Sequence, residues 1–85
     1  MTEVLAVFRS RAQATDCNMR MRASGIPCAL VNTPREAQIG CGLSVKFAQN
    51  YFMRAGRFIK GAGYSAFFGF LVADNRYGRT VYKRI

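Results

Sequence analysis

The residues of this 85-residue chain best suited to covalent chemistry are three cysteines, Cys17, Cys28 and Cys41. A cysteine attacks as its thiolate, so its reactivity depends on exposure and on the pKa of the thiol. Cys41 differs from the other two because Gly40 and Gly42 flank it and carry no side chains that could cover it. Two interpretations stay open here: Cys41 is a reactive thiol, or the glycines serve a tight turn in which Cys41 fills space.

Two basic residues lie near Cys41 in the sequence. Arg35 precedes it by six residues and Lys46 follows it by five. Either cation would lower the pKa of the thiol if the connection folds back toward it. Arg35 and Lys46 are therefore candidate supporting residues.

The other two cysteines are predicted to be structural. Cys17 shares the small-residue face of an expected helix with Met21, and Cys28 shares a strand face with Leu30. A buried cysteine behaves as a small apolar side chain, so both thiols are expected in the core.

The composition excludes several kinds of site. The chain has no histidine, which removes Ser-His-Asp and Cys-His nucleophile pairs and HExxH zinc sites. Its four carboxylates are scattered, and three cysteines without CxxC spacing are too few for a closed zinc site. We therefore expect no metal, no cofactor and no catalytic residue of a conventional enzyme.

The periodicity of apolar residues predicts the elements that must position the cysteines. A short apolar run predicts a strand, and small residues at helical spacing after Ser10 predict a helix that Gly25 ends. An amphipathic stripe predicts a second helix from Ala48, which Gly61 and Gly63 end. The expected elements are strands at 4–8, 28–31, 43–47, 64–73 and 79–85, a helix at 11–24, and a turn at 74–78.

The order βαββαβ indicates an α+β, ferredoxin-like sandwich. In this arrangement an antiparallel sheet carries both helices on one face, and residues 79–85 would form an extra C-terminal strand. No linker or internal repeat interrupts the chain, so residues 1–85 are expected to form a single domain.

One block of the sequence resembles a known family, the selenium/sulfur (Se/S) carrier protein-like family. In that family a segment ending in TPRE leads within a few residues to a CGL element followed by a basic residue and phenylalanine. The matching segments here are GIP at 25–27, LV at 30–31, TPRE at 33–36, CGL at 41–43 and VKF at 45–47. The resemblance covers about residues 4–60, and the tail after Lys60 is longer than the family pattern and matches it poorly.

The resemblance implies that Cys41 carries sulfur or selenium, as a persulfide or selenopersulfide. Arg35 would stabilise the added negative charge, and Gly40 and Gly42 would let a partner active site approach. Such a carrier is not itself an enzyme. Its expected partners are the sulfur- or selenium-handling enzymes that donate and accept the atom.

The charge of the chain supports a second hypothesis. Thirteen Lys and Arg against four Asp and Glu give a net charge of +9, which would attract an anionic partner or nucleic acid. The alternative function is therefore a small basic nucleic-acid-binding or adaptor domain in which Cys41 has no chemical role.

The sequence also predicts a cytoplasmic protein without a membrane partner. The start lacks the basic region of a signal peptide, and the longest uncharged stretch, Gly61 to Ala73, has 13 residues. Free cysteines fit a reducing compartment. Homodimerisation through an exposed sheet edge is left open.

Overall fold

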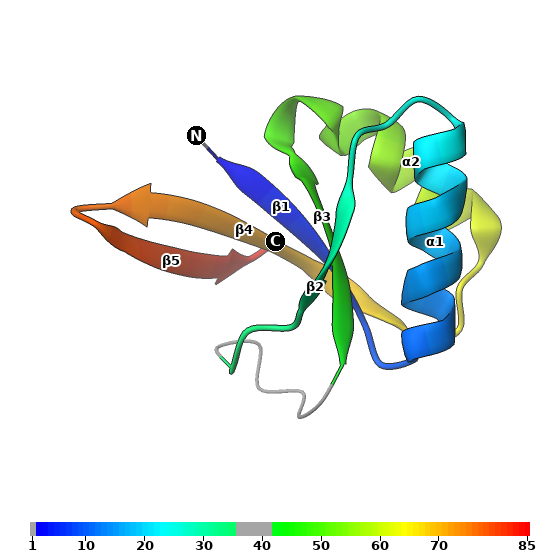
Figure 1. Cartoon of the computed structure of the whole chain (residues 1–85), viewed down its shortest axis with the longest axis horizontal. Coiled ribbons are helices and arrows are strands. Elements are labelled where there is room, and N and C mark those ends of the chain that lie inside the picture. The colour runs from blue at the N-terminus through cyan, green and yellow to red at the C-terminus, as the bar shows by residue number, and fades with distance from the viewer. Residues whose placement is uncertain (1, 36–41) are drawn as a thin grey trace.

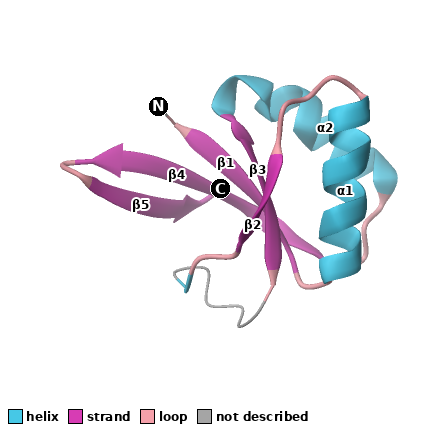
Figure 2. Cartoon of the chain, in the orientation of Figure 1, coloured by secondary structure: helices cyan, strands magenta, loops and turns pink. Residues whose placement is uncertain are grey.

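The computed structural model describes residues 2–35 and 42–85 of the chain. Five strands and two helices follow one another along this part of the sequence in the order βαββαββ (Figures 1 and 2). The elements are β1 (Glu3–Phe8), α1 (Arg11–Ala23), β2 (Ala29–Asn32), β3 (Leu43–Ala48), a 3-10 turn (Gln49–Tyr51), α2 (Phe52–Ala62), β4 (Phe67–Arg76) and β5 (Arg79–Arg84).

The strands form one antiparallel sheet in the order β2-β3-β1-β4-β5. The first four strands of this order are those of a ferredoxin-like fold, and β5 extends the sheet beyond β4. Both helices lie on the same face of the sheet, as Figure 2 shows. The predicted fold class and the additional C-terminal strand are therefore confirmed.

The core between sheet and helices is built around β1. Val4, Ala6 and Phe8 point toward the helices and pack with a buried cluster from β3, α1 and α2. Phe8 is fully buried, and its ring meets the rings of Tyr64 and Phe67 edge-on at centroid distances of 5.4 and 5.5 Å. Edge-to-face aromatic pairs add stability beyond the area that they bury.

The other face of the sheet has its own, smaller apolar cluster. Leu5 and Val7 of β1 are buried there with Leu71 and Ala73 of β4, and Phe68 packs partly over them. No described helix covers this face, which we call the open face. Its buried residues are sheltered by neighbouring side chains of the sheet itself.

Both ends of α1 are closed as the sequence predicts. The Ser10 hydroxyl accepts a hydrogen bond from the backbone N–H of Gln13 at 3.2 Å, which satisfies a free donor of the first turn. Gly25 adopts a φ of +85°, and the backbone N–H of Ile26 donates to the carbonyl of Met21 at 2.9 Å. This pattern is a Schellman motif, which favours glycine at the left-handed position.

Four predicted boundaries are wrong. The strand expected from Tyr64 begins at Phe67. Ala48 ends β3 instead of beginning the helix, because it pairs with Glu3 of β1, and the 3-10 turn at Gln49–Tyr51 then leads into α2. Gly61 lies inside α2, and Gly63 alone ends it in the left-handed region. Residues 74–76 belong to β4, so the turn between β4 and β5 contains only Tyr77 and Gly78.

We predict that Phe8→Ala destabilises the fold by about 3–5 kcal/mol, because it empties the centre of the helix-side core. Met53→Ala is the control, since Met53 is 69% exposed on α2 and its loss should change stability by less than about 0.5 kcal/mol. Urea unfolding monitored by circular dichroism measures both changes. Equal effects of the two substitutions would contradict this description of the core.

Candidate functional site

The predicted site residues lie in the connection between β2 and β3, except Lys46, which lies within β3. Of these residues, Gly40 and Cys41 lie outside the described residues, whereas Arg35, Gly42 and Lys46 lie within them. Arg35 is exposed and borders the segment on one side, and Gly42 borders it on the other.

The two ends of this connection are held together at the sheet. The backbone N–H of Thr33 donates to the carbonyl of Gly42 at 3.2 Å. The hydroxyl oxygens of Thr33 and Ser44 lie 2.8 Å apart, and this hydrogen bond satisfies the fully buried Ser44. The connection is thus a closed loop at one end of the sheet, and the residues that enter and leave it are fixed.

Lys46 lies farther along β3 than the end of the loop. It follows Gly42 by four residues, which corresponds to about 13 Å of strand. Its ammonium group pairs with the carboxylate of Glu3 at 3.8 Å. Of the two predicted cations, Arg35 is therefore the one whose backbone adjoins the loop segment.

The two described thiols are poor nucleophiles, as expected for structural cysteines. Cys17 is fully buried in α1, and its Sγ lies 3.5 Å from the Sδ of Met21. Burial, with smaller contributions from the nearby Cys28 and Asp16, raises the pKa of the Cys17 thiol from 9.0 to about 12. Cys28 is half-buried, donates to the carbonyl of Asn18 at 3.5 Å, and has a pKa raised mainly by burial. Both thiols stay protonated at neutral pH.

We predict that a small alkylating reagent modifies Cys41 first. Cys17 and Cys28 should react at similar rates to Cys41 only after unfolding in urea, because burial keeps them protonated and covered in the native protein. Peptide mass spectrometry after timed quenching measures the three rates. Faster native modification of Cys17 than of Cys41 would contradict the assignment.

The raised pKa of Cys17 also predicts a loss of stability in alkali. The unfolded thiol releases its proton above about pH 9 and the folded thiol only near pH 12, so its contribution is complete below pH 9 and disappears as the pH rises through that window. The free energy of unfolding should fall by up to about 1.4 kcal/mol per pH unit there. Urea titrations of the wild type and Cys17→Ala isolate this effect, since the variant should show a shallower decline. Parallel curves would contradict it.

A basic cluster on the open face lies at the same end of the sheet as the loop, and the sequence alone does not predict it. The guanidinium carbons of Arg9 and Arg84 lie 5.0 and 4.5 Å from the centre of the Phe68 ring. No described carboxylate lies within ion-pair distance of either arginine. Arg9 directly follows Phe8, whose partner Leu43 directly follows Gly42.

A β-bulge makes this cluster. Val7 faces Gly69 and Phe8 faces Phe67, so Phe68 is an extra residue in β4, and its ring packs on the open face. Arg9, Phe68 and Arg84 are far apart in sequence, and local spacing gives no indication that they meet.

Comparison with known proteins identifies the family. Residues 3–66 match the model of a family described as "Putative Se/S carrier protein-like". The chain belongs to this family. No curated protein and no solved structure matches the chain. The match runs from β1 to the residue before β4, and its extent agrees with the predicted resemblance over about residues 4–60.

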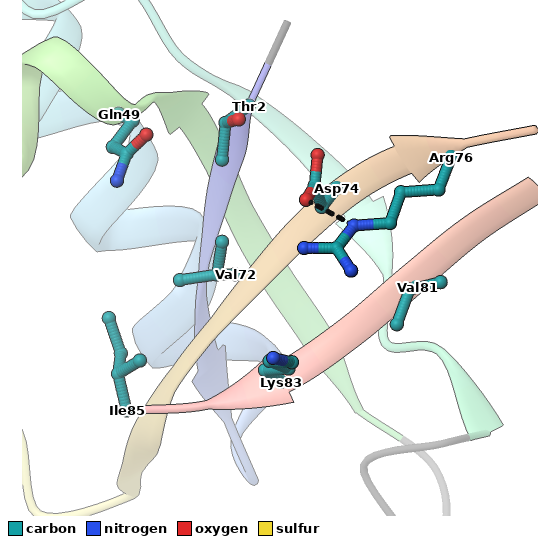
Figure 3. A pocket seen from close by; sticks show the side chains of 8 residues that line it. All are labelled: Thr2, Gln49, Val72, Asp74, Arg76, Val81, Lys83 and Ile85. Carbon is teal, nitrogen blue, oxygen red and sulfur yellow. Dashed lines mark hydrogen bonds and ion pairs between the residues drawn. The ribbon is translucent and has the colours of Figure 1, made fainter.

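Beyond the family match, the β4–β5 hairpin builds much of two hollows. One, of about 280 Å³, lies on the helix side of the hairpin, where Val72, Val81 and Ile85 meet Lys83 and the Asp74–Arg76 ion pair (Figure 3). The other, of about 350 Å³, crosses the open face and is lined by residues of all five strands: Glu3, Leu5, Val31, Asn32, Lys46, Ala73, Asn75, Thr80 and Tyr82. Both are open to solvent.

Residues 2–35 and 42–85 contain no group of three Cys, Asp or Glu side chains placed to hold a metal ion. None of the helices described there has the length and apolar character needed to cross a membrane.

Proposed function

We propose that this member of the Se/S carrier protein-like family carries sulfur or selenium on Cys41, as a persulfide or selenopersulfide. The observation that carries the proposal is the state of the other two thiols. Cys17 and Cys28 are packed against the core and have raised pKa values, which makes them unsuitable for exchange. Cys41 is the remaining thiol of the sequence and stands in the CGL element.

The transfer needs no redox partner. The Cys41 thiolate attacks the terminal sulfur of a donor enzyme's persulfide, a new S–S bond forms, and the donor's own S–S bond breaks. The donor cysteine leaves as a thiolate, and the outer sulfur keeps its oxidation state as it moves. Delivery repeats the same exchange with an acceptor thiol. Because the chain has no histidine, the donor and acceptor enzymes would supply any general acid or base.

The described cations suit an anionic cargo. A terminal persulfide is deprotonated more readily than a thiol, so a loaded carrier bears negative charge near its cysteine. Arg35 adjoins the loop segment, and Arg9 extends the basic surface at the same end of the sheet. These residues would stabilise the loaded state and attract the acidic surface of a partner. The free thiols of the two described cysteines, Cys17 and Cys28, fit a cytoplasmic carrier.

The proposal is tested by loading the protein with sulfur. Incubation with a cysteine desulfurase and free cysteine should add the mass of one sulfur atom, and a reducing thiol should remove it. Cys41→Ser should gain nothing, while the matched control Cys28→Ser should load as the wild type does. Intact mass spectrometry reads each outcome. Equal loading of Cys41→Ser, or no loading of the wild type, would refute the carrier function.

A further inference from the structure

The tip of the β4–β5 hairpin carries an unusual residue. Tyr77 and Gly78 form the two-residue turn, and both have positive φ, +52° and +75°. Turns of this kind favour asparagine, aspartate or glycine, because the left-handed conformation is unfavourable for a bulky side chain. The Tyr77 ring is also fully exposed, at 102% of its reference area. The tip lies at the far left of Figure 1, away from both helices.

The pair of residues that closes the turn is also unfavourable for stability. Arg76 and Arg79 face each other across the two strands, and like charges in this position repel. Asp74 accepts a hydrogen bond from Nε of Arg76 at 2.9 Å and draws that guanidinium back along β4, as Figure 3 shows. No described carboxylate pairs with Arg79, so its charge remains available at the tip.

The stability of the fold explains neither the tyrosine in the turn nor the pair of facing arginines. An asparagine in place of Tyr77 would suit the turn better, and the exposed ring buries nothing in the described fold. Backbone strain of this kind is characteristically kept at functional sites. The hairpin also lies outside residues 3–66, so the family match does not account for it. An exposed aromatic ring beside an unneutralised arginine fits a ligand that is both planar and anionic.

We propose that the hairpin tip binds single-stranded nucleic acid, with an unpaired base stacked on Tyr77 and a phosphate contacted by Arg79. Stacking on exposed aromatic rings and contacts from basic side chains are the two components of such binding. The charge of the whole chain favours it: the net charge is +9, and each described carboxylate already pairs with a cation. An acidic peptide would match the arginines but would leave the Tyr77 ring without a stacking partner.

The first test separates binding from folding. A fluorescein-labelled oligothymidylate of about 12 nucleotides, a length within known single-strand sites, is titrated with protein at low salt and followed by anisotropy. Tyr77→Asn creates the preferred Asn-Gly turn and should raise the melting temperature, yet weaken binding by about 5- to 150-fold. Tyr77→Phe keeps the stacking ring and should bind nearly as tightly as the wild type.

Tyrosine fluorescence gives an independent readout, because the chain has no tryptophan. The three other tyrosines, at positions 51, 64 and 82, are half-buried. An unlabelled oligonucleotide should therefore quench the wild-type emission mainly through Tyr77. That quenching should be largely absent from Tyr77→Phe, although this variant still binds.

The second test measures the phosphate contact. Arg79→Gln should reduce the slope of log affinity against log salt by about 0.7, the value for one contact to a single strand. Lys60→Gln is the matched control, since it removes one exposed charge from α2, far from the hairpin, and should leave the slope unchanged.

Four results would overturn the proposal. They are the absence of binding at low salt, equal affinities of Tyr77→Asn and the wild type, equal binding of a duplex of the same length, and equal binding of polyglutamate. The last result would show that charge alone attracts the ligand and would point to an acidic protein instead.

Discussion

The burial of β1 on both faces is the constraint on which the rest of this structure depends. Its residues from Val4 to Phe8 are at most 3% exposed, with alternate side chains facing the helices and the open face. Since β1 pairs with β3 on one side and β4 on the other, its register also positions the start of β3, which follows the β2–β3 connection, and the start of β4. Phe8 lies beside Leu43, close to the start of β3, and beside Phe67, where β4 begins.

The sequence predicts the parts of the fold that depend on local pattern. The apolar run of β1, the cap at Ser10 and the glycine at position 25 each have a local physical cause, and the structure confirms them. The predicted boundaries are wrong where pairing with a distant strand determines where an element ends. Ala48 fits the helical stripe but pairs with Glu3, and the polar residues that end β4 resemble a turn although β5 pairs with them.

The same distinction applies to the candidate site. Cys41 is identified as a candidate by its immediate neighbours in the sequence. Which basic residues lie near one another depends instead on how strands distant in the sequence pair. Lys46 is near Cys41 in sequence but pairs with Glu3, while Arg84 lies near the end of the chain and reaches Phe68. A β-bulge and the pairing of five strands bring Arg9, Phe68 and Arg84 together. The spacing of these residues in the sequence does not indicate either feature.

The hydrogen bonds of Thr33 mark the boundary between the sheet and the β2–β3 connection. They close the loop at Gly42 and Ser44, so the pairing of β2 with β3 is set before the chain enters the loop. The entropic cost of lengthening a closed loop is small, about 0.6 kcal/mol per doubling. Residues can therefore be inserted into this connection, deleted from it or exchanged, while the pairing of β2 with β3 stays the same.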